Sequence, residues 1–481
     1  MASSSSPPKT FRGKVLSNVP PDVLSEINKL EDMFVVPREK LKQITEHFVK
    51  ELEKGLTAEG GNIPMNVTWV MGFPSGNEQG KFLTLDMGGT NLRVCQVALT
   101  DGRGQYEIIQ SKYQMPESLK SGTADELWGF IADCTATFIQ ENRLAEGLSN
   151  GKLPVSFTFS FPVTQPTIQS GILQRWTKDF DVDGVEGHDV VPQLGAALEK
   201  RNVPVKIIAV VNDTTGTLIA SSYEDPEIQI GSIFSTGCNA AYMEECGSIP
   251  KIKDYGLPDN LPIAINTEYG AFDNDRKVLP RTRFDCIIDE SSPRLGQQIY
   301  EKMVAGLYLG EILRLVLIDL HDRSGFFNGQ DISALRKPHV IDSAFLSTAE
   351  GDQSQGLDDI ASIFNRDLGI KPAPHELKVS RYLVVLICTR AARLYACGIA
   401  AICKKKNIQS CHVGVDGSVF NNYPNFRERA AGALREILDW PEGTEDPVTL
   451  HSARDGSGVG AALIAALAME RSKGRRGGPQ E

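Results

Sequence analysis

Two short glycine-centred segments, one in each half of the chain, constrain its fold more than any other feature. They are Asp86-Met87-Gly88-Gly89-Thr90-Asn91 and Ser235-Thr236-Gly237-Cys238-Asn239, and each follows an apolar run typical of a strand. Each places Gly and then Asn where a tight hairpin turn leaves backbone N–H groups pointing outward, and such a turn can bind phosphate. Gly89 and Gly237 are 237 − 89 = 148 residues apart, as are Asn91 and Asn239. This shared spacing predicts a duplicated unit with a nucleotide held between two domains.

Composition favours a multidomain globular protein that binds a small molecule. A chain of 481 residues should divide into two or three domains. Its net charge of −11 gives no general attraction for nucleic acid or for an anionic membrane, so a phosphorylated ligand must be held by local groups. We expect small-molecule substrates, no nucleic-acid partner, and a monomer or weak homodimer.

Cysteine usage and hydropathy predict a cytoplasmic protein. The nine cysteines form no Cys-x-x-Cys pair, and the N-terminus shows no apolar secretory stretch. The most apolar long stretch, residues 382–403, is interrupted by Arg390 and Arg393. We therefore predict reduced thiols and no membrane span.

Hydrophobic periodicity predicts a mixed α/β layer architecture. Apolar residues recur every three or four positions between residues 22 and 56, as amphipathic helices require. Strand patterns occupy residues 81–99, 155–160, 205–211, 231–244 and 412–415, and helical patterns occupy 296–320, 376–404 and 425–438. Residues 1–18 and 471–481 hold too few apolar groups to offset the entropy of ordering, so both ends are predicted to be disordered.

The first turn offers the groups that a nucleotide phosphate needs. Asp86 stands at a strand end, where it is poised toward Mg²⁺ through water, and no side chain is expected to ligate the metal directly. Glycine lets the backbone approach a charged ligand, and the neighbouring polar side chains add donors. An ordinary type I′ hairpin explains the same residues equally well. The candidate phosphate-binding residues here are Gly88, Gly89, Thr90, Asn91 and Arg93.

An acid at the end of a second apolar strand is our candidate general base. Asp213 follows Val210-Val211-Asn212 and precedes Thr214-Thr215-Gly216-Thr217. An alcohol is a weak nucleophile until its proton has an acceptor, and a carboxylate within hydrogen-bond reach orients the hydroxyl and takes that proton. The competing interpretation, which this motif alone favours, is that Asp213 caps the following helix.

A further set of polar residues suits a neutral polyol. A sugar offers many hydroxyls and no charge, so specificity requires several fixed polar groups. Each residue alone has a simpler explanation as a surface or strand-end group, and only their combination points to a sugar. The set comprises Ser160, Thr177, Lys178, Asn212, Asn239, Glu268 and Glu301, and Lys178 could also stabilise the transferring phosphoryl charge.

Two small-residue segments near the C-terminus join a strand or loop to a helix. They are Gly414-Val415-Asp416-Gly417-Ser418 and Asp455-Gly456-Ser457-Gly458-Val459-Gly460. Exposed backbone there can accommodate a ribose or adenine, or a helix N-terminus can face phosphate. Close helix packing explains the second segment equally well.

Taken in order, these motifs resemble those of hexokinases, and the chain is most similar to the fungal single-unit type. The resemblance runs from about Asp22 to Met469. It rests on Leu85–Val94, Phe157-Thr158-Phe159-Ser160-Phe161-Pro162, Trp176-Thr177-Lys178, Val211–Thr217, Asn266-Thr267-Glu268-Tyr269-Gly270, Gly296-Gln297-Gln298-Ile299-Tyr300-Glu301 and Asp455–Gly458.

The resemblance implies a two-lobed actin-like ATPase (ribonuclease H-like) fold with a duplicated β-sheet core and an interdomain cleft. The large domain would comprise residues 19–76 and 213–455, and the small domain 77–212 and 456–470. ATP and Mg²⁺ would occupy the cleft, and the enzyme would phosphorylate the 6-hydroxyl of D-glucose and related hexoses such as fructose and mannose, the first step of glycolysis.

The resemblance also implies a role for each matching residue. Asp213 would be the base, and Lys178 would contact sugar and phosphate. The sugar would be held by Ser160, Thr177, Asn212, Asn239, Glu268 and Glu301. ATP would be held by Asp86, Gly88, Gly89, Thr90, Asn91, Arg93, Thr236, Gly237, Gly417 and Ser418.

Four positions depart from the family pattern near the predicted site. Asp179 and Ser235 stand where glycine is usual, Arg454 where an acid is common, and Leu295 where proline is usual. A left-handed backbone at position 235 would make any side chain costly. We expect weakened kinetics. The alternatives are a sugar sensor that has lost catalysis, and an actin- or chaperone-like ATPase, which would have no need for the polyol set.

Overall fold

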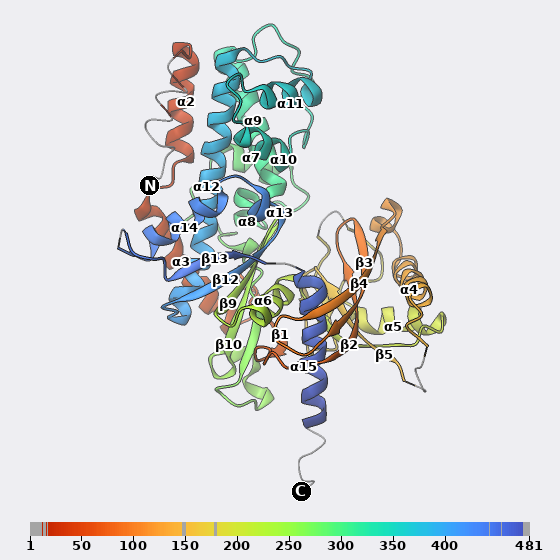
Figure 1. The fold of residues 1–481 in the computed structure, drawn as a ribbon. Helices are drawn as coiled ribbons and strands as arrows, with labels where there is room; N and C mark the ends of the chain where they lie inside the picture. Colours follow the sequence, from red (N-terminus) through yellow and green to blue (C-terminus); the bar gives the residue numbers. More distant parts are fainter. Residues whose placement is uncertain are drawn as a thin grey trace.

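The computed structural model describes residues 12, 16, 18–146, 151–177, 180–441, 443–453 and 455–474. Its core consists of two β-sheets, each covered by its own helices (Figure 1). We refer to the part built on the smaller sheet as the small lobe and to the rest as the large lobe. The α/β prediction is confirmed.

The small-lobe sheet has five strands in the order β4-β3-β2-β5-β8. Its first three strands form an antiparallel meander, and its last two run parallel to β2. The bounds are β2 Gly80–Met87, β3 Asn91–Leu99, β4 Tyr106–Gln114, β5 Leu153–Phe159 and β8 Val205–Val211. A small hairpin, β6 Val163–Thr164 and β7 Ile172–Leu173, follows β5.

The large-lobe sheet repeats this topology. Its order is β1-β11-β10-β9-β12-β13, so β9, β10 and β11 form the meander and β12 and β13 are the parallel strands. The bounds are β1 Asn66–Met71, β9 Ile228–Phe234, β10 Cys238–Glu245, β11 Pro262–Asn266, β12 Cys411–Asp416 and β13 Val448–Ser452. Only β1, which pairs with β11, is extra. The predicted duplication of the sheet core is therefore confirmed.

Both glycine segments form hairpin turns, but the shared spacing of 148 residues is not the structural register. Met87 pairs with Leu92 to close the first turn, and Phe234 pairs with Cys238 to close the second. The corresponding closing residues are thus 234 − 87 = 147 and 238 − 92 = 146 residues apart. The second turn is one residue shorter, so the two turns correspond strand by strand and not residue by residue.

Most helices belong to the large lobe. The small lobe carries α4 and α5, and α4 begins with a capping box in which Thr123 and Glu126 satisfy each other's backbone N–H groups. The small-lobe helices are α4 Ala124–Glu141 and α5 Val190–Lys200. Those of the large lobe are α2 Pro21–Phe34, α3 Arg38–Thr57, α7 Arg283–Ser291, α8 Ile299–Val304, α9 Gly306–Ser324, α10 Ser343–Gly351, α11 Asp358–Leu368, α12 Pro374–Lys406, α13 Ser418–Asn422 and α14 Phe426–Ile437.

The helix predicted over residues 296–320 is two helices, α8 and α9. Ala305 between them has an extended backbone, with φ −77° and ψ 152°. The N–H of Gly306 donates to the carbonyl oxygen of Ser235 at 2.8 Å, and a Cβ on Gly306 would lie 2.7 Å from that oxygen. The break therefore lets the start of α9 pack directly against the second turn.

Helix α12 forms the centre of the large lobe. By length and composition it is the one helix in the described ranges that could cross a membrane, yet its most apolar window is entirely buried inside the protein. Arg390 lies within it and donates to both carboxylate oxygens of Asp285 at 2.7 and 2.8 Å. A charge that is paired in this way belongs in a protein interior, so α12 is a core helix.

Helices α6 Asp213–Glu224 and α15 Ala461–Gly474 lie between the two sheets (Figure 1). Helix α6 contacts β9 and β10, and α15 contacts β2, β5 and β8. The helical turn η5, Gly456–Gly460, leads into α15 and crosses α6 so closely that a Cβ on Gly460 would lie 2.0 Å from the carbonyl oxygen of Gly216. The packing explanation for this glycine segment is therefore confirmed.

Part of the segment predicted to be disordered at the N-terminus is packed against the large lobe. Leu16 is buried in the main core cluster, and Arg12 donates to Glu31 on α2 at 2.7 Å. The expectation of disorder does not fit these two residues, because one apolar and one charged contact hold them.

Candidate active site

A cavity of about 230 Å³ receives residues from both lobes. Two strand ends of the small sheet, the second hairpin, the start of α6 and η5 meet there. The lining residues are Asp86, Gly88, Ser160, Asp213, Thr217, Ile233, Asp416 and Ser457. Four of the predicted site residues are thus brought to one place: Asp86, Gly88, Ser160 and Asp213.

Asp213 is the first residue of α6, and its neighbour caps the helix. The side-chain oxygen of Asn212 accepts the N–H of Thr214 at 2.9 Å. Asp213 Oδ1 also accepts from that N–H, at 2.8 Å. The alternative that Asp213 itself is the cap is therefore wrong, since Asn212 fills that position.

The first turn is held by a charged network that reaches the C-terminal segment. Arg93 lies opposite Asp86 on the paired strand, and their side chains are 3.5 Å apart. Arg93 also donates to Asp455 at 2.5 Å, and Ser457 donates to Asp86 at 2.6 Å. Burial opposes the charged guanidinium, but the bond to Asp455 and the nearby carboxylates prevail and raise the pKa of Arg93.

One side of the second turn is held by neutral groups. The hydroxyls of Ser235 and Ser418 are 3.0 Å apart. Gly417 has φ 133°, and a Cβ at this position would lie only 2.3 Å from the carbonyl oxygen of Phe234, so there is no room for a side chain. Ser235 does not have a left-handed backbone. The expected cost of a side chain at position 235 is therefore not observed, because that position does not need glycine.

The predicted sugar-binding residues Asn239 and Glu268 contact each other, and Asn266 joins them. Asn239 Nδ2 lies 3.2 Å from Glu268 Oε1, and Asn266 Nδ2 donates to the same oxygen at 2.8 Å. Glu268 has a left-handed backbone, φ 54°, which the N–H bond to Asn239 Oδ1 at 3.0 Å holds in place. Asn266 is a member of the site that the sequence analysis quoted within a motif but did not assign.

Glu301 connects the sugar-binding residues to the second turn. Its Oε2 accepts the N–H of Cys238 at 3.0 Å, and a Cβ on Gly237 would lie only 2.7 Å from the same oxygen. A side chain at position 237 would therefore displace this carboxylate. Gln298, which lies 3.4 Å from Glu301 Oε1, is a second neighbour that the sequence analysis did not assign.

Electrostatics show that three acids face one another across this region. Burial raises the pKa of Glu268, and the charges of Asp213 and Glu301 raise it further, against the hydrogen bond from Asn266. Glu268 therefore interacts electrostatically with both Asp213, the candidate base, and Glu301, which contacts the second turn.

Asp416 is an acid of the cavity that the sequence analysis did not select. It ends β12, where it pairs in register with Ile233 of the second hairpin. Burial raises its pKa, and so do the charges of Asp213 and Asp455. The signal was present in the strand-end sequence Gly414-Val415-Asp416, which the analysis interpreted only through the residues that follow.

Thr177 lies in the small lobe at the end of a well-fixed segment. Trp176 before it is buried, and its indole N–H donates to the carbonyl oxygen of Val182 at 3.1 Å. The predicted residue Lys178 and the departures Asp179 and Arg454 lie outside the described residues. Leu295 lies within them and is 61% exposed.

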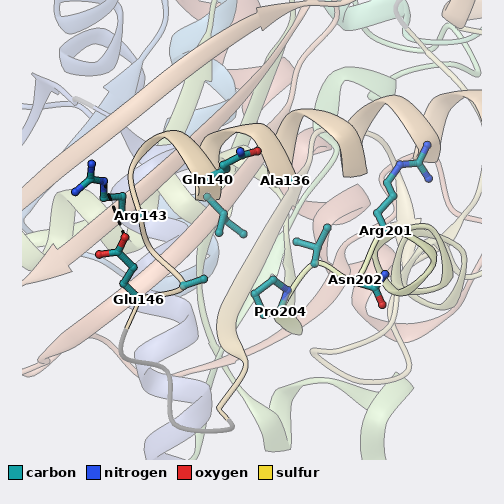
Figure 2. A pocket seen from close by; sticks show the side chains of 10 residues that line it. Ala136, Gln140, Arg143, Glu146, Arg201, Asn202 and Pro204 are labelled. Atoms are coloured by element: carbon teal, nitrogen blue, oxygen red, sulfur yellow. Dashed lines mark ion pairs between the residues drawn. The ribbon is translucent and has the colours of Figure 1, made fainter.

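A larger cavity, of about 330 Å³, lies in the small lobe between the end of α4 and the start of β8 (Figure 2). Its floor is apolar, and its charged side chains pair locally: Arg143 lies 3.9 Å from Glu146, and Arg201 donates to Asp133 at 2.5 and 3.0 Å. None of the predicted site residues within the described ranges lines it. The smaller cavity is therefore the candidate active site.

Comparison with known proteins finds similar proteins over nearly the whole chain. Two family models described as hexokinase match residues 26–223 and 229–467. A hexokinase of Emericella nidulans is 59% identical over 460 residues, which cover 95% of this chain and 94% of that protein. Hexokinase-1 of Saccharomyces cerevisiae is 48% identical over 469 residues, which cover 96% of each chain. The solved structure of a Schistosoma mansoni hexokinase complexed with glucose aligns with TM-score 0.84 and 35% identity, over 92% of this chain and 98% of that one.

Proposed function

This chain belongs to the hexokinase family, and we propose that Asp213 activates the 6-hydroxyl of D-glucose for attack on the γ-phosphate of ATP. Family membership makes the protein an ATP-dependent hexose kinase, a transferase with the two-lobed actin-like fold. The observation that carries the proposal is the position of Asp213. It lines the cavity with Asp86 and Gly88 of the first turn, and its charge reaches Glu268 of the predicted sugar site.

The sugar-binding side of the proposal rests on the contact between Asn239 and Glu268 and on Glu301, which accepts the N–H of Cys238 next to Asn239. An ionised carboxylate accepts hydrogen bonds from neighbouring hydroxyls, and an amide both accepts from them and donates to them, which suits a polyol. A site built to hydrogen-bond hydroxyls discriminates strongly against analogues that lack them. We assign sugar binding to Ser160, Thr177, Lys178, Asn212, Asp213, Asn239, Glu268 and Glu301, with Lys178 also a catalytic contact to phosphate.

The nucleotide side rests on the two turns. Their backbone N–H groups and hydroxyls are the donors, and Arg93 supplies a fixed positive charge. We assign ATP binding to Asp86, Gly88, Gly89, Thr90, Asn91, Arg93, Thr236, Gly237, Gly417 and Ser418.

The residues present fit a magnesium ion held by the ATP phosphates. Asp86 and Asp416 line one cavity with Asp213, and mutual repulsion among such acids would be relieved by a divalent cation. Mg²⁺ prefers oxygen ligands and keeps several waters, so Asp86 would reach it through water. When bound, the ion would neutralise charge that develops on the transferring phosphoryl group.

The proposal extends to the domain limits, the cytoplasmic location and the oligomeric state. We assign residues 19–76 and 213–455 to the large domain and 77–212 and 456–470 to the small domain. Sugar-driven closure of the two lobes would exclude water from the γ-phosphate. We propose a monomer or weak homodimer in the cytoplasm, in keeping with a net charge of −11 and with reduced cysteines. The resemblance to hexokinases adds fructose and mannose as proposed further acceptors.

A coupled assay for glucose-6-phosphate tests the proposal. The purified chain, supplied with glucose, ATP and Mg²⁺, should produce glucose-6-phosphate with saturation in both substrates. The same assay with fructose and mannose establishes the hexose preference. Tight glucose binding in calorimetry without product would instead favour a sugar sensor.

A further inference from the structure

We propose that Arg294 is a positioning residue that fixes the sugar-binding segment of the small lobe against the large lobe. The inference rests on the proposed function, because it concerns how Thr177 is aligned with Glu301. Arg294 lies between α7 and α8, and its guanidinium donates to the carbonyl oxygen of Trp176, which is 118 residues away in the chain. This bond joins the two lobes one residue before Thr177.

The acceptor of this bond is held rigidly by the small lobe. Trp176 is 1% exposed, and its ring stacks on Phe180 and meets the edge of Phe161. Its indole N–H donates to the carbonyl oxygen of Val182, and its backbone N–H donates to Glu186. The ring and the N–H of Trp176 are thus anchored within the small lobe, so the bond from Arg294 joins the large lobe to a well-packed residue of the small lobe.

The donor is fixed equally well from the large lobe. Lys302 Nζ donates to the carbonyl oxygen of Arg294, to Ser292 Oγ and to Asp289 Oδ1, each at 2.8 Å. Asp289 Oδ1 also accepts the N–H of Gly296 at 2.9 Å. Lys302 and Asp289 are both buried. The buried pair therefore holds the loop that presents Arg294, and it does so from the residue next to Glu301.

The two fixed ends give the bond a specific consequence for the sugar site. Glu301 belongs to α8, and Thr177 follows Trp176, so the bond sets the separation between two predicted sugar ligands that come from different lobes. Another interlobe bond, from the indole of Trp69 to the carbonyl oxygen of Gln165, lies beside the chain connection that leads from β1 to β2. Gln174, two residues before Trp176, also donates to Asn66 of β1 at 3.4 Å. Arg294 itself belongs to the loop between α7 and α8 and not to a segment that connects the lobes, so its bond to Trp176 can break when the lobes separate and form when they close.

The chemistry of the bond predicts an effect on glucose and not on ATP. A hydrogen bond from a charged donor to a rigid acceptor is among the stronger ones in proteins. Replacing Arg294 by methionine keeps the length of the side chain and removes every donor. Arg294→Met should therefore raise the KM for glucose about tenfold, while the KM for ATP and kcat change less than about threefold.

Two further variants and one control separate positioning from general damage. Arg294→Lys keeps a donor and should recover the glucose KM to within about threefold of the wild type, whereas Arg294→Gln, which is shorter and uncharged, should not. Arg276→Met removes a guanidinium that pairs with the same Asp289 at 3.1 Å but makes no bond to the small lobe among the described side chains. That control should have an ordinary glucose KM.

The experiment is steady-state kinetics in both substrates, with direct calorimetry of glucose binding and thermal unfolding of every variant. An unchanged glucose KM in Arg294→Met, an equal rise in the KM for ATP, or the same defect in Arg276→Met would overturn the proposal. An inactive wild-type protein would instead refute the proposed function, and the calorimetric comparison of glucose affinities would still test Arg294.

Discussion

The two hairpins differ in the residue pair that lies next to the pair closing each turn. In the first hairpin this pair is Asp86 and Arg93, and in the second it is Ile233 and Asn239. The charged pair of the first hairpin is tied to Asp455 and Ser457. In the second hairpin the amide of Asn239 turns toward Glu268, and the turn is tied to Glu301. Duplication has preserved the strand topology while the side chains diverged, and under the proposed function the first turn would bind phosphate while the second would also contact the sugar.

The largest effect within this comparison is expected from Asp86→Asn. The change removes the charge that faces Arg93 and the cavity, and with it the proposed water-mediated contact to Mg²⁺. Loss of one such electrostatic group should lower kcat/KM for ATP about 100-fold, with a higher Mg²⁺ requirement. Ile233→Val, at the corresponding position of the second hairpin, should change kcat/KM about twofold at most. Equal losses in both variants would show that the hairpins do not differ as we describe.

A smaller effect, confined to glucose, is expected from Gly237→Ala. The new Cβ would lie 2.7 Å from Glu301 Oε2, so the carboxylate must move. Its displacement should raise the KM for glucose about tenfold. In Gly88→Ala the Cβ would lie 3.4 Å from the carbonyl oxygen of Asn91, an ordinary contact, so the glucose KM should stay within about twofold. A glucose KM that rises in Gly88→Ala and not in Gly237→Ala would reverse the assignment of the two turns.

The buried charge of Glu268, in the predicted sugar site, should lower the thermal stability of the protein slightly. The folded-state pKa of Glu268 is raised by burial and by nearby acids, so its charged form destabilises the fold. This cost is absent below the ordinary carboxyl pKa and is complete above the raised one. Glu268→Gln should therefore unfold about 1–3 °C higher than the wild type at pH 8 without sugar, and the gain should vanish as the pH falls toward 4.5. Calorimetric scans across pH measure the difference, and a gain that grows on acidification would contradict the assignment.

The smallest effect is expected from Ser235→Gly. The backbone at this position needs no glycine, and the hydroxyl contact with Ser418 is neutral and partly exposed. The KM for ATP should remain within about twofold of the wild type. A severalfold gain in activity would mean that serine at position 235 does weaken the enzyme.

Much of the fold could be predicted from the sequence, because local pattern and turn chemistry agree. The amphipathic spacing between residues 22 and 56 gives α2 and α3, and the two glycine turns close hairpins where they were expected. The register of those hairpins could not be predicted. The second turn is one residue shorter than the first, yet the Gly and Asn residues of the two motifs are still separated by the same number of residues. The break at Ala305 could not be predicted either, because its cause is the distant carbonyl of Ser235.

The candidate site shows the same division. Residues at strand ends, such as Asp86, Asp213 and Ser160, were found because they follow apolar runs, and the structure brings them to one cavity. Asp416 was not selected because the small residues around it, including Gly417 and Ser418, were interpreted as exposed backbone for a nucleotide. The role of Lys302 in holding the loop between α7 and α8 could not be inferred. Nothing in the neighbouring sequence indicates that this lysine is buried and bonded to Asp289, Ser292 and Arg294.

The most direct test of the account is Asp213→Asn, which keeps the acceptor for the Thr214 N–H and removes the basic carboxylate. Turnover of glucose and ATP should be measured by the coupled assay, and glucose affinity by calorimetry on the same preparation. The account predicts that kcat falls by about 100- to 10,000-fold while the glucose Kd stays within about threefold. A kcat within tenfold of the wild type would contradict it, because the proton of the attacking hydroxyl would then have another acceptor.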